Sequence, residues 1–570
     1  MTDHDSGPGS RPVCFSKLIA FEISRGGGRP APRWSARHTL PWGAGAPPED
    51  PTPKSTYSGM HFAYSPAMCT PAANPSPRCF PTSIDASREF VGVSFGDRTL
   101  SERCLLIAKA FVRSPGASLP AMMASETELA GAYRFFNNPK VSPESLLFPH
   151  VQATLERLRD CLDWLCVHDT TEMAYAGTRK GLGPLQGKRR GYLAHAALAV
   201  AGGGLGPLGV LNLELLTRPD PPSPRRRKSS KRHKKRRVAS YSVGPENEHS
   251  RWWRSVESVE ARAKRKGLTR PIHLFDREGD SYLFIAMLIE HGCRFVLRMA
   301  HNRALVVKKG RKARYISDAL RPLQTRSERD ISISERDPKL RAPDALKKHA
   351  PRAERDVHLK ISSTQLVLKR PDAAPDWLPS EIKVNVVHAY EPNPPPGETP
   401  VEWKLMTSES IQTKADVEHV VDLYRGRWVI EEFFKALKSG CAVLDREFEK
   451  AVALQNVLAM SIPIAWQMLA LRTLARRDEK APAIAVLTQP QIELVVAASQ
   501  QLPPRQRPPP NPTARQALLA IAALGGHLTR NGEPGWLTLA RGLHQLRKLE
   551  ASLSVWEHIR SRTVEFGVGS

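Results

Sequence analysis

The sequence lacks the patterns of a disulfide-stabilised or zinc-stabilised protein. Its eight cysteines are scattered over 570 residues, without a CxxC pair and without Cys and His at the spacing of zinc ligands. Neither a disulfide framework nor a structural zinc is therefore indicated, and a reducing cytoplasm is expected. A signal peptide is not expected either, because Lys17 interrupts the only short apolar run near the N-terminus.

Long hydrophobic runs that would cross a membrane are also lacking. Two stretches carry no charge, residues 194–213 and 451–471. Glycines 202–204 interrupt the first, which predicts a β-hairpin with strands at 192–200 and 208–216. Pro463 and three amide side chains interrupt the second, and charged helical sequence flanks it. We therefore predict a buried core helix there, and no membrane partner.

Acidic residues are too few to balance the basic ones. The chain has 84 Lys and Arg against 57 Asp and Glu, a net charge of +27, while 41% of its residues are hydrophobic and can form cores. A folded protein with a basic surface indicates a polyanionic partner, most often nucleic acid. Residues 218–237 hold eleven of the cations and one acid, Asp220, so this segment is predicted to be a solvated basic loop.

The length predicts two to four domains rather than one. Residues 1–81 contain 14 of the 49 prolines and show no helical or strand periodicity, which predicts disorder. The expected divisions are a disordered extension at 1–85, a small helical domain at 86–148, an α/β core that begins at 149–302, a mostly β insertion at 303–410, a core helix at 411–450 and a helical C-terminal region at 451–570.

Two predicted strands end in an aspartate. Asp169 follows the apolar run Trp-Leu-Cys-Val-His, and Asp276 follows Ile-His-Leu-Phe. If the two strands are parallel neighbours, both carboxylates lie at the edge of the sheet where α/β proteins bind their ligands. Taken singly, an acid after a strand more often caps the next turn.

A third carboxylate lies on a predicted helix with a polar stripe. At about 100° per residue, four side chains fall within about 60° of one another: Tyr424, Arg427, Glu431 and Lys438. The core side of this helix is formed by Ile430, Phe433 and Leu437. Glu432 falls off the stripe, so Glu431 is the better ligand candidate. Three carboxylates with cations nearby fit a Mg²⁺ site for phosphoryl transfer, and the alternative is a solvated helix face with intrahelical ion pairs.

These motifs resemble those of the bacterial cut-and-paste DDE transposases of the insertion-sequence-four family. The stripe reads Y-x2-R-x3-E-x6-K, and V-H-D-T-T and F-D-R-E-G-D precede it. Similarity extends upstream to residues 95–98, to 114–118 and to the run Tyr-Arg-Phe-Phe-Asn-Asn-Pro at 133–139, and downstream to 532–542. It thus covers roughly residues 90–570.

The resemblance implies an α/β fold with an RNase-H-like catalytic core and a β insertion, between a helical transposon-end DNA-binding domain and a helical C-terminal region. It implies that Asp169, Asp276 and Glu431 are catalytic and bind two Mg²⁺ ions, for which Mn²⁺ can substitute. The residues implied to contact DNA are Tyr424, Arg427, Lys438, Arg298, Trp403, Tyr133, Arg134 and Asn137. For Trp403 alone, a place in the core is the competing interpretation.

The resemblance also implies the reaction and the partners. A dimer would bind the inverted repeats of double-stranded DNA, cleave them through a hairpin, and transfer the strands into target DNA, in the cytoplasm at the nucleoid. One alternative is a tyrosine recombinase with Tyr424 as the nucleophile, which would leave the acids without a role. The other is a decayed transposase that acts as a DNA-binding repressor or inhibitor, against which the three intact acids argue.

Overall fold

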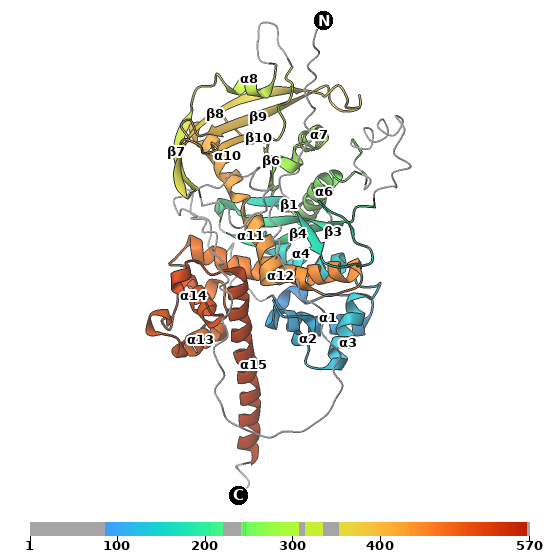
Figure 1. Ribbon diagram of the computed structural model, residues 1–570, viewed down its shortest axis with the longest axis vertical. Helices are drawn as coiled ribbons and strands as arrows, with labels where there is room; N and C mark the ends of the chain where they lie inside the picture. The colour runs from blue at the N-terminus through green and yellow to red at the C-terminus, as the bar shows by residue number, and fades with distance from the viewer. Residues whose placement is uncertain are drawn as a thin grey trace, which may run out of the picture.

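The computed structural model describes residues 86–220, 241–306, 314–333 and 353–566, apart from positions 188, 205, 243, 245 and 246. The predicted extension at 1–85 lies outside the described residues, as does most of the predicted basic loop. A large sheet has helices on both faces, and the N-terminal helices lie beside the C-terminal ones at one end of it (Figure 1).

The sheet is mixed and has ten strands in the order β2-β3-β1-β5-β6-β10-β9-β8-β7, with β4 paired to β3. Strands β1, β5 and β6 are parallel neighbours, and the other pairs are antiparallel. The strands are β1 (Trp164–Tyr175), β2 (Gly183–Pro184), β3 (Arg190–Ala201), β4 (Pro207–Leu216), β5 (Ile272–Phe275), β6 (Arg294–Arg298), β7 (Ser327–Ile333), β8 (Arg355–Lys369), β9 (Glu381–Tyr390) and β10 (Glu402–Thr407). The predicted hairpin is confirmed as β3 and β4.

The first strand is longer than predicted. We expected it to end at Asp169, but β1 continues to Tyr175 because β3 pairs with it along its whole length, from Trp164↔Ala201 to Tyr175↔Arg190. The parallel pairing with β5 ends earlier, at Val167↔Leu274. Asp169 therefore lies inside a strand rather than at its end.

The strands of the predicted insertion extend the core sheet. Strand β10 pairs with β6, with Leu405 opposite Arg298, and β9, β8 and β7 follow outward. Two short runs that the sequence suggested at 356–361 and 366–369 form the single strand β8. Residues 303–410 thus add strands to the sheet that carries both aspartates.

The helices cover the two faces of the sheet unequally. Side chains from α10, α11 and α12 share one core with Leu165, Val167 and Leu274, whereas α6 and α7 pack on the side of Phe275 and Phe295. The helices before the insertion are α1 (Arg98–Arg113), α2 (Leu119–Met122), α3 (Glu126–Phe136), α4 (Pro143–Arg157), α6 (Ser250–Arg265) and α7 (Tyr282–Glu290). Those in and after it are α8 (Ile316–Leu320), α10 (Lys414–Gly426), α11 (Val429–Lys435), α12 (Ala451–Arg477), α13 (Gln489–Ala498), α14 (Ala514–Leu524) and α15 (Trp536–Phe566).

Helix α12 is long and apolar enough to cross a membrane by length and composition, but 89% of its most apolar window is buried inside the protein. It packs against α4, β4 and α14. The predicted buried core helix is confirmed. The predicted boundary between residues 148 and 149 falls inside α4, which reaches from the N-terminal helices to β4.

A buried ion pair joins the short 3₁₀ turn Arg88–Phe90 to α4. Glu89 accepts a hydrogen bond from His150 Nδ1 at 2.6 Å and pairs with Arg157 at 2.8 Å. His150 Nε2 accepts from the Val210 amide, so Nδ1 carries the ring proton. Burial would raise the pKa of Glu89, but His150 and Arg157 outweigh it and lower this pKa to about 2.

Glu89→Gln is expected to lower the free energy of unfolding by about 3 kcal/mol at pH 7, because it leaves Arg157 without its buried partner. A depressed carboxyl pKa stabilises the fold above the unfolded value of 4.5 and loses that contribution as the pH falls toward 2. Urea unfolding should show that the difference in free energy of unfolding between the wild type and Glu89→Gln is smaller at pH 3 than at pH 7. Glu102→Gln is the control, because its pair with Arg98 is exposed. An equal difference at both pH values would contradict the assignment.

Candidate active site

The two aspartates project from the same face of the sheet. Side chains alternate along a strand, so Asp169 shares the side of Leu165 and Val167, which faces α11. Asp276 directly follows β5 and continues the register of Leu274, two positions beyond its pairing with Val167. Both carboxyl groups are buried. The predicted meeting of the two acids thus arises from parallel pairing, although only one of them ends its strand.

One guanidinium joins this acid pair to the helix. Arg427 Nη1 lies 3.3 Å from Asp169 Oδ2, and its Nη2 donates to Glu431 Oε1 at 2.5 Å. Arg427 is itself buried. Three segments far apart in the sequence therefore bring their carboxylates around a single cation.

The carboxylates are held in an environment that disfavours their charge. Burial is the largest cause that raises the pKa of Asp169, Asp276 and Glu431. The charge of Asp276 raises the pKa of Asp169 further, and the charge of Arg427 opposes the shift in all three groups. Carboxylate oxygens are the hard ligands that Mg²⁺ and Mn²⁺ take, so the donor types fit a divalent cation. The Arg427 guanidinium occupies the place between Asp169 and Glu431.

The helix that carries the polar stripe is not continuous. Helix α10 ends at Gly426, α11 begins at Val429, and a π-helical turn, Ala436–Gly440, follows. Around the interruption, amide hydrogen bonds have the tighter three-residue spacing, as from Glu431 N to Trp428 O. The tight turn and the wide π turn shift the helix face in opposite senses, and the stripe stays directed at β1.

Lys438 reaches the strand through this π turn. Its Nζ donates to Thr171 Oγ1 at 2.7 Å, and Thr171 lies on the same face of β1 as Asp169. Burial lowers the pKa of Lys438 to about 8, while the negative charge of Glu172 opposes the shift. Lys438 therefore carries a positive charge at neutral pH for most of the time.

Glu432 points away from the acids, as its angular offset predicts. Its carboxylate pairs with Lys435 at 2.7 Å and with Arg472 at 3.8 Å, on the side of α12. The core face predicted for the helix is also confirmed: Ile430, Phe433 and Leu437 are buried.

An aromatic and cationic cluster borders the acids. The ring of Tyr424 lies 5.9 Å from that of Trp403, and the guanidinium carbons of Arg298 and Arg427 each lie 5.9 Å from the Tyr424 ring centre. Trp403 is half-buried and packs against the main core at its edge. Trp403 therefore belongs in part to the core, and its implied contact with DNA stays a prediction.

Of the three residues predicted in the N-terminal domain, Tyr133 and Arg134 lie on α3 and Asn137 is its C-cap. Helix α3 lies apart from β1 and α11 (Figure 1). Tyr133 is half-buried, and its ring lies 5.3 Å from Phe448. Arg134 and Asn137 are exposed, and Asn137 caps the helix by donating to the Tyr133 carbonyl. The structure therefore brings Tyr424, Arg427, Lys438, Arg298 and Trp403 to the acids, but not these three.

Sequence reasoning missed residues on the opposite face of the sheet. Cys166, His168 and His273 offer ligand atoms within 4.8 Å of one another, because strand pairing places His273 opposite Cys166. Both rings already have partners: His168 contacts His273 at 2.9 Å and Ser255 at 3.3 Å, and His273 contacts Glu260 at 3.3 Å. Burial lowers the pKa of both histidines, so we assign this cluster to packing.

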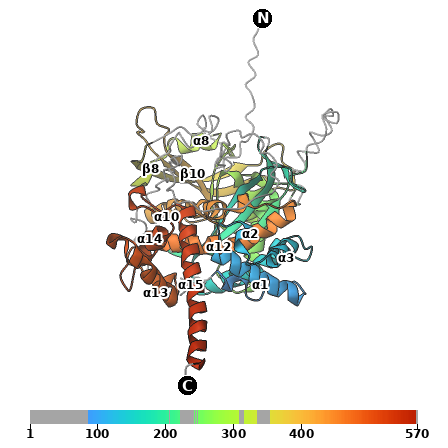
Figure 2. The same cartoon turned by 60° about the horizontal axis from the view of Figure 1, so that its bottom comes forward.

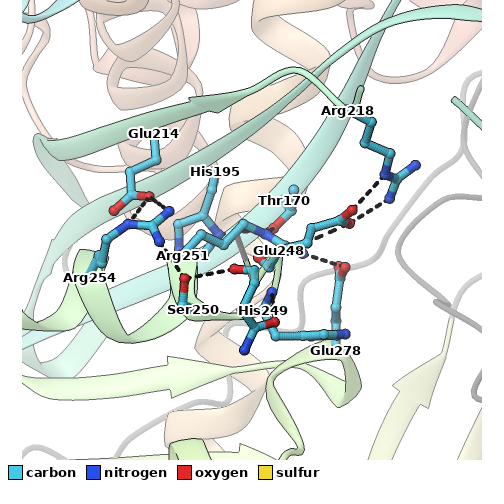
Figure 3. Close-up of polar contacts among 11 residues, drawn as sticks. Thr170, His195, Glu214, Arg218, Glu248, His249, Ser250, Arg251, Arg254 and Glu278 are labelled. Atoms are coloured by element: carbon cyan, nitrogen blue, oxygen red, sulfur yellow. Dashed lines mark hydrogen bonds and ion pairs between the residues drawn. The ribbon is translucent and has the colours of Figure 1, made fainter. Parts of the chain in front are cut away.

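A second missed group surrounds Arg251 on α6, behind Thr170 and Glu278 (Figure 3). Arg251 follows no motif in the sequence. Only the docking of α6 on the sheet could reveal its contacts.

Two parts of the chain match models of known families. Residues 86–141 match the model of transposase DNA-binding domains, and residues 233–464 match the model of the transposase DDE domain. The first match contains the helices α1 to α3. The second contains Asp276 and Glu431 and begins after Asp169.

Proposed function

Because this protein is a transposase with an N-terminal DNA-binding domain and a DDE catalytic domain, and so a metal-dependent phosphoryl-transfer enzyme with an RNase-H-like core, we propose that it is a cut-and-paste enzyme of the insertion-sequence-four family. The single observation that carries the proposal is that Arg427 contacts both Asp169 and Glu431 beside the buried Asp276. A tyrosine recombinase would have no use for this set.

In this proposal Asp169, Asp276 and Glu431 hold two Mg²⁺ ions, and Mn²⁺ can replace them. When bound, the ions supply Lewis-acid activation of water and of a 3′-hydroxyl. Arg427 neutralises part of the carboxylate charge that the ions would otherwise balance. Because Arg427 is buried, charge neutralisation is favoured for it over the direct phosphate contact that its motif implies.

The remaining cations would hold the DNA backbone beside the acids. Lys438 and Arg298 lie on either side of Tyr424 and Arg427 along the same site and would bind phosphates. Hydrolysis at the element's end would leave a 3′-hydroxyl. Its oxygen attacks the phosphodiester of the opposite strand, which closes a hairpin and displaces the 3′-oxygen of the flanking DNA. A second hydrolysis opens the hairpin, and the same 3′-hydroxyl then joins target DNA.

The DNA that flanks the gene offers the direct test. Matched inverted repeats found there would be made as short duplexes and incubated with the protein and Mg²⁺. We expect a nick at the repeat boundary, followed by a hairpin, and no covalent link between Tyr424 and DNA. Specific binding without any cleavage would instead favour a decayed protein that acts as a repressor.

Trp403→Ala is expected to slow hairpin closure by about 5- to 150-fold while nearly sparing the first nick. A hairpin forces one base out of the stack, and an aromatic face that receives it contributes roughly 1–3 kcal/mol, which at 1.36 kcal/mol per tenfold gives this range. Trp377→Ala is the matched control, because Trp377 is an exposed tryptophan between β8 and β9. Equal slowing of both steps in a protein with a lower melting temperature would assign Trp403 to the core alone.

We further propose that the active form is a homodimer on DNA, located at the nucleoid in the cytoplasm. Helix α15 projects from the body of the protein (Figure 2) and carries exposed apolar side chains along its outer part, including Leu549, Leu553 and Val555. Sedimentation with and without end DNA would test the dimer.

A further inference from the structure

We propose that Arg251 is a positioning residue for the two aspartates, holding the residues whose backbone amides orient them. The inference rests on the proposed function and concerns residues on the face of the sheet opposite to the acids. It identifies the physical link between helix α6 and the candidate metal ligands.

Arg251 is buried to 1% exposure and has a partner for each guanidinium nitrogen. Nε donates to Thr170 Oγ1 at 3.1 Å, Nη2 to Glu278 Oε1 at 2.5 Å, and Nη1 to the Glu248 carbonyl at 2.6 Å (Figure 3). A planar guanidinium fixes the directions of its partners, which a lysine ammonium does not. Arg251 thus ties β1, the turn after β5 and the start of α6 to one rigid group.

Each of its two side-chain partners orients an aspartate. The Thr170 amide donates to Asp169 Oδ1 at 2.8 Å, and the Glu278 amide donates to Asp276 Oδ1, also at 2.8 Å. In both aspartates one carboxylate oxygen is therefore held by a backbone amide, and Arg251 contacts the side chain of the residue that supplies this amide. Asp169 Oδ2 faces the opposite way, toward Arg427.

The position of Arg251 is itself fixed from outside. Arg218, just beyond β4, donates to both carboxylate oxygens of Glu248 at 2.6 and 2.5 Å. Thr170 is held a second time, by His195 Nδ1 at 2.9 Å. Arg251, Thr170 and Glu278 are buried, so removing the donor disturbs the two amides rather than a mobile surface group.

Arg251→Lys tests the role while keeping the charge. Residues that orient metal ligands typically contribute 10- to 100-fold in metal affinity or activity. We expect Mn²⁺ affinity in the absence of DNA, measured from the free-Mn²⁺ electron paramagnetic resonance signal, to fall by about 10- to 100-fold. Cleavage at low Mg²⁺ should fall by a similar factor and recover in part at high Mg²⁺, with end-DNA binding unchanged.

Arg254→Lys is the matched control. Arg254 lies on the same helix and pairs with Glu214 at 2.7 Å, without a contact to either amide-supplying residue (Figure 3). It should leave Mn²⁺ affinity and cleavage near the wild-type values. Glu278→Gln keeps the shape of the other partner, so it carries the test if Arg251→Lys does not fold. The double variant should lower Mn²⁺ affinity little more than either single variant, because both substitutions act on the contact between Arg251 and Glu278.

Wild-type Mn²⁺ affinity and cleavage in a folded Arg251→Lys protein would overturn the proposal. So would a loss that follows only the unfolded fraction, or an equal loss in Arg254→Lys. Failure of the proposed function would look different: wild-type protein would not cleave end DNA, or Asp276→Asn would cleave it normally.

Discussion

Asp276→Asn is expected to abolish cleavage of end DNA, with a loss of about 1,000-fold or more. The substitution keeps the shape of the side chain and removes one of three charges available to a divalent cation. Metal activation contributes several kcal/mol to such reactions, and each 1.36 kcal/mol is tenfold in rate. Nicked and hairpin products on end duplexes in Mg²⁺ are the measurement.

Binding of end DNA should survive this change, because the matched DNA-binding domain at 86–141 is separate from the acids. Asp163→Asn is the control, since Asp163 is an exposed acid just before β1. It should cleave at the wild-type rate. Cleavage by Asp276→Asn at that rate would remove Asp276 from the catalytic set.

Arg427→Met should lower the free energy of unfolding by about 3–5 kcal/mol in the absence of divalent ions, because it leaves buried carboxylates without their shared cation. Urea unfolding in EDTA measures the loss. A divalent ion supplies the missing positive charge, so Ca²⁺ should raise the stability of the variant more than that of the wild type.

A surface arginine gives the comparison. Arg98 pairs with Glu102 where both side chains are exposed, so Arg98→Met should lower the free energy of unfolding far less than Arg427→Met does. Equal stability of Arg427→Met and the wild type in EDTA would show that the carboxylates do not depend on this cation.

The sequence by itself determined the features that depend on local periodicity. Glycines 202–204 between two β-rich runs fixed the hairpin of β3 and β4. The uncharged run at 451–471 fixed a buried helix, because polar interruptions made it unsuited to lipid. The helical period of 3.6 residues placed Glu431 and Glu432 on different sides of the helix, as they are in the structure, even though the helix is interrupted between α10 and α11.

Only the tertiary structure decided the features that depend on pairing between distant segments. Strand β1 extends past Asp169 because β3 pairs with it, and no local signal marks that length. Arg427 turned out to lie between carboxylates rather than on an open DNA-facing stripe, because β1 docks against α11. Arg251 acquired its partners when α6 packed on the other face of the sheet. Each depends on contacts between segments at least 15 residues apart in the chain, where period and composition carry no information.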